Sequence, residues 1–209
     1  MTKGFAAALV LACAWLAPAA EAKPPKPGGP VAGMREPGPA PNPVAEEMSR
    51  YTAPGPHHRE LEAFAGSWTT RMLVRDGPDA RPLEFAGSAE YRMILGGRFL
   101  QLESRMLVNG VENHGLGLYG YDAFKEKYSC YYIHDGETQA LVGLGDRDST
   151  GTAITFEVAM DMPVTGERGK PIRAVLRRVS DHRHVFEMFE KYMDGREWKV
   201  LEITYDRAR

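Results

Sequence analysis

"LEFAGSAEYRMILGGRFLQLESRMLV", residues 83–108, is the stretch that decides the class of fold. Its first run places on one face Leu83, Phe85, Ala89, Tyr91, Met93 and Leu95, and on the other Glu84, Ser88, Glu90 and Arg92. Its second run alternates Leu100, Leu102, Met106 and Val108 with Gln101, Glu103 and Arg105. Alternation with a period of two indicates half-buried strands, and Gly96-Gly97 between the runs suits a tight hairpin. The stretch therefore predicts an antiparallel β-hairpin.

The same pattern continues along the chain. Further turn dipeptides are Asp76-Gly77, Asn109-Gly110, Asp135-Gly136 and Asp194-Gly195. They separate runs of strand length. About ten strands are predicted, near residues 67–75, 82–95, 98–108, 113–121, 127–134, 138–145, 152–160, 171–180, 183–193 and 196–205. A single helical candidate precedes them, "HHRELEAFAG" at residues 57–66, with Leu61 and Phe64 one turn apart and Gly66 as its stop.

Ten sequential antiparallel strands are too many to remain an open sheet, because twist accumulates and exposed edges invite aggregation. Closure into a barrel removes both problems. The predicted fold class is therefore all-β: a closed antiparallel up-and-down β-barrel of about ten strands, preceded by one short helix.

The N-terminus predicts export. Lys3 is followed by an apolar run from Phe5 to Leu16 and by an Ala-x-Ala site that ends at Ala22, the order of a secretory signal peptide over residues 1–22. The apolar run is too short to span a bilayer. Cys13 offers lipoprotein processing as an alternative, but the bulky Leu11 is unsuited to that site, so we favour cleavage and a periplasmic or secreted protein.

Residues 23–56 have a different composition, because ten of the 15 prolines and five glycines lie there. Such a segment cannot bury enough apolar surface to offset the entropy of ordering, so we expect a disordered Pro/Gly-rich linker. The stretch "KPPKPGGP" leaves open a partner motif of polyproline type. The folded domain is expected at residues 57–209, a size that suits one core.

Charge and cysteine content exclude several classes of function. Without residues 1–22 the chain has 25 Lys and Arg and 27 Asp and Glu, so its net charge stays at −2. Such a chain has no strong positive electrostatic field that would attract nucleic acid. We expect no transmembrane segment in the mature chain, and a monomer or weak homodimer. Cys130 would be the only remaining cysteine; it lies among tyrosines with no nearby cation, which favours a buried structural thiol over a catalytic one.

A barrel of this strand number can hold a small ligand. Large side chains from different strands are the candidates for its lining: Tyr91, Met93, Tyr119, Tyr132, Phe156 and Met188. They equally suit a solid core. In "GLGLYGY", residues 115–121, Gly115 and Gly117 share a face with two tyrosines, and the parity of the strand does not decide whether that face points inward. No helix follows these glycines, which argues against a phosphate-binding loop.

Five stretches in the same order carry a family resemblance: "LEAFAGSWTT", "ILGGRFLQLE", "GLGLYGYDAFKEKY", "HVFEMFEKY" and "VLEITYDR". Together they resemble the bacterial domain-of-unknown-function family 1579 and, more distantly, the calycin (lipocalin-like) barrels. The calycin likeness implies that Gly66-x-Trp68 opens the first strand and that Trp68 closes one barrel end beneath a basic residue of the last strand, Arg207 or alternatively Arg209. Such a pair is a cation–π contact with a structural role.

The resemblance implies binding of a small apolar molecule. The similar nitrobindins hold haem through a histidine of the final strand, but the matching stretch "KVLEITY" has Val200 and Glu202 and no histidine. His182 and His184 share a strand face and could form a two-His site, although "SDHRHV" also suits a solvated turn. His114 and His134 beside hairpin turns are the other candidates.

No catalytic constellation is recognisable, because Gly-x-Ser-x-Gly and His-Glu-x-x-His are both missing from the sequence. The acids of "HDGE" (134–137) and "GDRD" (145–148) suit turns, and Glu103, Glu157 and Glu187 would matter only if they point into the barrel. We therefore expect an exported binding protein for a small apolar molecule, without a cofactor or metal. The alternatives are an enzyme with an inward carboxylate or histidine, and a haem-binding or protein-interaction module.

Overall fold

The computed structural model describes residues 43–191 and 195–209. The expected signal peptide and the first part of the expected linker lie outside the described residues. Helix α1 spans Pro43–Thr52 and helix α2 spans Pro56–Glu62. Ten strands follow: β1 Gly66–Val74, β2 Leu83–Ile94, β3 Phe99–Val108, β4 Val111–Asp122, β5 Lys127–His134, β6 Leu141–Arg147, β7 Ala153–Met162, β8 Glu167–Ser180, β9 Arg183–Lys191 and β10 Glu197–Arg207.

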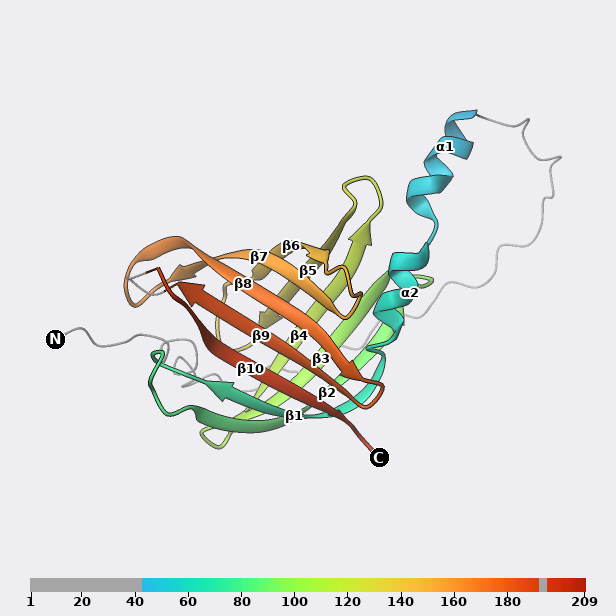
Figure 1. Cartoon of the computed structure of the whole chain (residues 1–209). Coiled ribbons are helices and arrows are strands. Elements are labelled where there is room, and N and C mark those ends of the chain that lie inside the picture. Colours follow the sequence, from blue (N-terminus) through green and yellow to red (C-terminus); the bar gives the residue numbers. More distant parts are fainter. Residues whose placement is uncertain (1–42, 192–194) are drawn as a thin grey trace, which may run out of the picture.

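Each strand pairs antiparallel with its neighbours in the chain, and β1 pairs with β10, so the ten strands form one closed barrel (Figure 1). The closing register runs from Trp68 opposite Arg207 to Val74 opposite Leu201. The predicted fold class is confirmed. Because the order is up-and-down, the turn after β1 and every second turn after it lie at one end, and α2 lies at the other.

The turns follow the predicted chemistry. Asn109 and Gly110 have φ angles of 51° and 82°, as a two-residue hairpin turn requires. Leu95, which the alternation places on the inner face of β2, instead has a φ of 50° and is 68% exposed. The reason is the turn, because the amides of Gly97 and Arg98 both donate to the Ile94 carbonyl and end the strand there.

Helix α1 differs from the expectation of an extended linker as far as residue 56. Its sequence PVAEEMSRYT has proline only at the first helical position, where no amide is needed, and contains no glycine. The helix projects away from the barrel (Figure 1), and its C-terminal end contacts the turns through Tyr51 against Phe124 and through the Arg98 guanidinium, which donates to the Thr52 carbonyl. Among the described residues, no helix is both long and apolar enough to cross a membrane.

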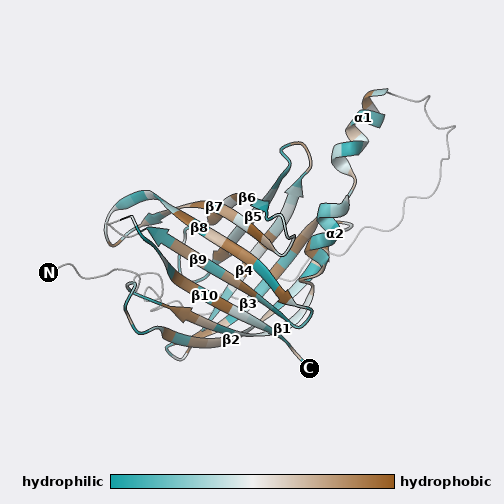
Figure 2. Cartoon of the chain, viewed as in Figure 1, coloured by the Kyte–Doolittle hydropathy of each residue, from teal (hydrophilic) through white to brown (hydrophobic). Residues whose placement is uncertain are grey.

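Helix α2 covers one end of the barrel. Leu61 is fully buried there and Phe64 nearly so, and both join the core. A polar cluster fixes the helix to β5 and β6: the Tyr128 hydroxyl and the Arg147 guanidinium both donate to the Glu60 carboxylate. Hydrophobic and hydrophilic positions alternate along the strands (Figure 2), so the side chains between α2 and the barrel wall form a packed apolar layer.

Gly66, Trp68 and Arg207 come together where β1 meets β10. The Arg207 guanidinium carbon lies 4.3 Å from the centroid of the Trp68 ring, and the indole N–H donates to the Phe64 carbonyl at 2.9 Å. Gly66 has a φ of 127°, and a Cβ atom there would lie 2.5 Å from the Arg207 Nη1. Arg207 also donates to the carbonyls of Ala65 and Asp181, so a single side chain joins the start of β1, the end of β10 and the β8–β9 turn.

We expect Arg207→Ala to lower the free energy of unfolding by about 2 kcal/mol, because it removes the cation–π contact and two charge-assisted hydrogen bonds. Urea denaturation would measure the change. Arg209→Ala is the matched control, since Arg209 is exposed beyond the end of β10 and should cost less than about 0.5 kcal/mol. Equal effects of the two changes would contradict the closing role of Arg207.

Candidate functional site: the interior cavity

The barrel is hollow at the end away from α2. A cavity of about 150 Å³ lies there, lined mainly by apolar side chains from eight strands. Its apolar wall consists of Met72, Leu102, Met106, Val108, Leu141, Met160, Phe186, Met188, Leu201 and Ile203. An apolar cavity of roughly 150 Å³ is large enough for a benzene molecule. The interior can therefore hold a small apolar group without rearrangement.

The six residues expected to line the interior divide between cavity and core. Tyr119, Tyr132 and Met188 line the cavity. Tyr91 and Phe156 are almost completely buried in the packed layer, and Met93 packs against the same core. The six were chosen as large side chains from different strands, and side-chain size carries no information on depth along the barrel axis.

Gly115 and Gly117 of β4 face inward and make room for Tyr132. A Cβ atom on Gly115 would lie 2.0 Å from the Tyr132 hydroxyl and 2.5 Å from the Ser104 hydroxyl. At Gly117 the corresponding atom would be 3.1 Å from Leu102. The space opened by the missing side chains is thus filled by the Tyr132 ring, whose hydroxyl lies 3.1 Å from the Ser104 Oγ.

The cavity floor is a layer of hydroxyl groups between the hollow and the packed halves of the barrel. Thr70, Ser104, Tyr119, Tyr132 and Tyr205 line the cavity, and Tyr91 lies behind them with its ring centroid 5.7 Å from that of Tyr205. Burial, and then the proximity of the other tyrosines, raises the pKa of Tyr91 and of Tyr119 well above the ordinary value. These phenols therefore remain neutral and can both donate and accept hydrogen bonds.

His184 lies in the same layer, which corrects the expectation of a solvated turn. Only 1% of the residue is exposed, since its ring stacks on Tyr205 with centroids 4.2 Å apart and meets Trp68 edge-on at 4.3 Å. Burial, followed by the nearby Arg207 charge, lowers the pKa of His184 to about 3. The imidazole is therefore neutral. His182 is exposed at the turn, so the two histidines form no shared site.

Several polar atoms of this layer have no partner. Within the described chain, neither ring nitrogen of His184 nor the Thr70 Oγ1 makes a hydrogen bond. These atoms are enclosed and have no surface exposed to the cavity. Unpaired polar atoms in an apolar interior lower the stability of the fold.

The rim of the cavity carries polar residues of the β3–β4 and β5–β6 hairpins. His114 is half exposed there, and the His134 Nε2 lies 3.2 Å from the Glu137 carboxylate. The Asp135 carboxylate accepts the His114 amide at 3.1 Å, so "HDGE" serves as turn chemistry. Over the described ranges, no cluster of three or more His, Cys, Asp or Glu could hold a metal ion.

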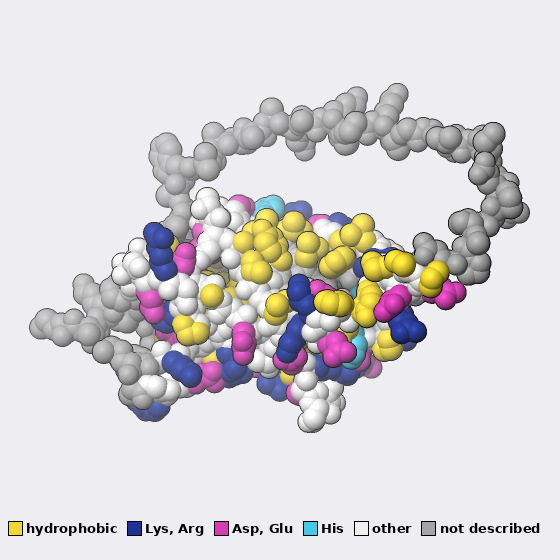
Figure 3. Space-filling model, turned by 90° about the horizontal axis from the view of Figure 1, so that it is seen from above, with side chains coloured by type: hydrophobic (Ala, Val, Ile, Leu, Met, Phe, Trp, Pro, Cys, Tyr) yellow, Lys and Arg dark blue, Asp and Glu magenta, His cyan; other side chains and the backbone are white. Residues whose placement is uncertain are grey.

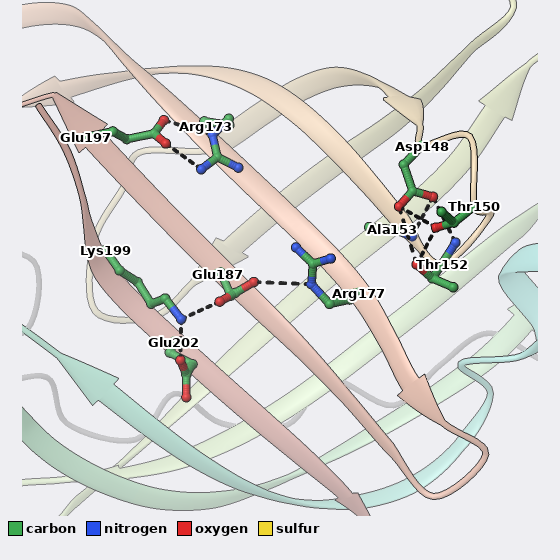
Figure 4. Close-up of polar contacts among 10 residues, drawn as sticks. All are labelled: Asp148, Thr150, Thr152, Ala153, Arg173, Arg177, Glu187, Glu197, Lys199 and Glu202. Carbon is green, nitrogen blue, oxygen red and sulfur yellow. Dashed lines mark hydrogen bonds and ion pairs between the residues drawn. The ribbon is translucent and has the colours of Figure 1, made fainter.

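The other acidic candidates also have structural partners. In "GDRD", the Asp148 carboxylate accepts the amides of Thr152 and Ala153 and the Thr150 hydroxyl (Figure 4). Glu103 pairs with Arg92, and Glu157 is exposed on β7.

Glu187 is largely buried, but it lies on the outer face of β9 (Figure 4). There its carboxylate pairs with Lys199 and, at 3.6 Å, with Arg177. The alternation of β9 explains this orientation, because the flanking Phe186 and Met188 point into the cavity. None of the three strand glutamates therefore supplies an inward carboxylate.

Cys130 lies in the cavity wall with 4% of its surface exposed. Burial raises the pKa of its thiol to about 12, so it stays protonated and behaves as a small apolar side chain. This agrees with the structural role that the sequence favours.

The outside of β4 to β6 carries a patch of exposed apolar side chains, and Figure 3 shows hydrophobic side chains gathered on the upper face of the barrel. On adjacent strands, Tyr131 is paired across the sheet with Leu118 and Val142, and Leu116 and Leu144 lie nearby. By contrast, β8 to β10 carry the ion pairs of Figure 4. An interaction module would need a face of the first kind.

The structure supplies no support for haem bound in the nitrobindin manner. The cavity of about 150 Å³ is below the roughly 300–1,000 Å³ typical of cofactor sites. The final strand, residues 197–207, contains no histidine. His184 does not line the cavity and lies behind Tyr205.

A closed ten-stranded up-and-down barrel with one hollow end defines the class of protein. The chain belongs to the family described as "Protein of unknown function (DUF1579)", whose model matches residues 53–207. This match bears out the resemblance in the sequence. No curated protein matches the chain.

Solved structures include similar barrels. Rv2717c from M. tuberculosis is 16% identical, with a TM-score of 0.53, and the alignment covers 75% of this chain and 100% of that one. The S-type phycobiliprotein lyase CPES from Guillardia theta is 10% identical, with a TM-score of 0.49, covering 78% and 97% of the two chains. At this identity the likeness to Rv2717c concerns the fold alone.

Sequence reasoning missed the hydroxyl layer. Thr70 and Tyr205 were not among the candidates, although Thr70 follows Trp68 at the strand period and Tyr205 precedes Arg207 at the same period. These two residues are direct cross-strand partners in the closing pair. Strand alternation could have found them: two residues along each strand from the Trp68–Arg207 pair, the next pair that faces the interior is Thr70 and Tyr205.

We expect Gly115→Ala to lower the free energy of unfolding by about 2 kcal/mol, because the added methyl would clash with Tyr132 and Ser104 and push the tyrosine into the cavity. Thermal or urea unfolding would measure it. Gly77→Ala is the control, since nothing lies within 4 Å of a Cβ there. If the two changes are equally neutral, Gly115 does not make room for Tyr132.

The buried neutral His184 predicts a specific pH dependence of stability. The unfolded histidine has a pKa near 6.5 and the folded one a pKa of about 3, so acid favours the unfolded state between these values. The stability contribution is fully present above pH 6.5 and falls by up to about 1.4 kcal/mol per pH unit, or about 4 kcal/mol in all by pH 3.

His184→Phe should remove this component. The free energy of unfolding of the variant should therefore fall less steeply than that of the wild type as the pH is lowered. Urea denaturation at a series of pH values measures it. Acidic groups titrate in both proteins and cancel in the difference. His182→Gln, at the exposed turn, should follow the wild-type curve. Parallel curves for His184→Phe and wild type would show that His184 is not buried neutral.

Proposed function

We propose that this protein binds a small, largely apolar molecule inside the barrel, and that it does so outside the cytoplasm. The observation that carries the proposal is the cavity of about 150 Å³, whose wall is apolar and whose floor carries the hydroxyl groups of Ser104, Tyr119, Tyr132 and Tyr205. Ligand sites are typically concave, mostly apolar and provided with a few placed polar groups.

The size of the cavity limits the ligand to about one aromatic ring or a short aliphatic chain, with any further part extending through the rim. Among the residues that the structure describes, no lysine or arginine lines the cavity, so none of them would neutralise an anionic ligand there. Catalysis is less well supported, because the inner face holds no carboxylate among the three strand glutamates and the interior histidine is neutral and enclosed.

Export is supported by the sequence of residues 1–22. Lys3, the apolar run and the Ala-x-Ala site have the order of a cleaved signal peptide. A linker at residues 23–42 would then separate the barrel from the cleavage site. We place the ligand-binding domain in the periplasm or outside the cell on this basis.

The direct test is a native mass spectrum and absorbance scan of the full mature protein purified from the organism that makes it, followed by thermal shifts against a panel of small aromatic and aliphatic molecules. We expect a stoichiometric added mass or a concentration-dependent thermal shift. A Soret band would instead favour haem. Neither an added mass nor any shift would contradict the binding function.

A matched pair of variants locates the binding. Met106→Trp should reduce occupancy at least about tenfold, because Met106 lines the cavity and the larger ring fills it. Leu107→Trp adds the same ring to the adjacent, outward-facing position, which is 56% exposed, and should leave binding unchanged. Equal loss in both variants, or loss in neither, would place the ligand elsewhere.

A further inference from the structure

The cavity floor carries hydroxyl groups. Four side chains that line the cavity bring them from β3, β4, β5 and β10: Ser104, Tyr119, Tyr132 and Tyr205. Each hydroxyl can donate one hydrogen bond and can also accept. The Ser104 and Tyr132 hydroxyls lie 3.1 Å apart and bond to each other. The floor can therefore form hydrogen bonds with a polar group of a ligand.

The charge state of the layer is also fixed. Burial holds the pKa of Tyr132 above its ordinary value and that of Tyr119 well above it, and His184 behind Tyr205 is neutral. Arg207 lies against the Trp68 ring at the barrel end and is not among the cavity-lining residues. A charged group at the floor would thus be desolvated without a counter-charge, which is costly.

We propose that the ligand carries an uncharged hydrogen-bonding group, such as a carbonyl or a hydroxyl, and that this end enters the barrel first and meets the tyrosine hydroxyls of the floor. The apolar remainder of the ligand then lies against the Met and Leu wall and points to the rim at His114. This inference rests on the proposed function and specifies the chemical class and orientation of its ligand.

Three probes of similar size separate these possibilities: acetophenone, with a carbonyl; cumene, its apolar counterpart; and benzoate, its charged counterpart. Dissociation constants would be measured by calorimetry or NMR titration with the full mature chain. We expect acetophenone to bind at least about tenfold more tightly than cumene, as one buried hydrogen bond allows, and benzoate to bind more weakly than acetophenone.

Two variants assign the preference to the floor. Tyr119→Phe and Tyr205→Phe each remove one hydroxyl with little change of shape, and each should reduce the acetophenone-to-cumene preference while leaving cumene binding intact. Both are expected to fold, since each change keeps the aromatic ring, and the Tyr205 ring stays stacked on His184. Tyr131→Phe is the control, because Tyr131 lies on the outside of β5 and is 40% exposed.

The outcomes are distinct for the two proposals. Equal affinity for acetophenone and cumene, or a preference that survives both floor variants, would overturn the inference that an uncharged polar end enters first and leave the apolar binding function standing. Benzoate as the tightest probe would overturn the uncharged class. If none of the three probes binds and none competes with a co-purified molecule, both the function and this inference fail.

Discussion

The pairing of β1 with β10 is the constraint on which the rest of the structure depends. It closes the sheet, removes both exposed edges and forces every second residue of each strand into one shared interior. Arg207 holds this seam at the α2 end, because its guanidinium covers Trp68 and binds carbonyls from two other segments. The Gly66 backbone and its missing side chain make that contact possible.

Closure alone does not decide whether the interior is packed or hollow. This barrel is packed at the end near α2 and hollow at the other end. Large rings and α2 fill the Trp68 end, whereas the side chains of the other end leave a cavity. Between them lies the hydroxyl layer, which places neutral polar groups at the floor of the cavity.

The sequence was sufficient to predict the barrel, because hairpin dipeptides such as Asn109-Gly110 and the period-two alternation of residues 83–108 are local signals. The sequence was not sufficient to predict how far along the barrel axis each inward side chain lies. Tyr91 and Tyr119 share the inner face, yet one is enclosed in the core and the other borders the cavity. That distinction depends on which side chains meet across the barrel, and Tyr132 filling the space above Gly115 is such a long-range contact. The same limit explains His184, whose neighbours Trp68 and Tyr205 are distant in the chain.

The most direct measurement of the central claim is a high-resolution crystal structure of the mature chain purified from its own organism. A hollow end whose floor carries hydroxyl groups predicts non-protein electron density within hydrogen-bonding distance of the Tyr119 or Tyr205 hydroxyl, continuous with density along the Met and Leu wall. An interior filled by the protein's own side chains, with no such density, would contradict the account.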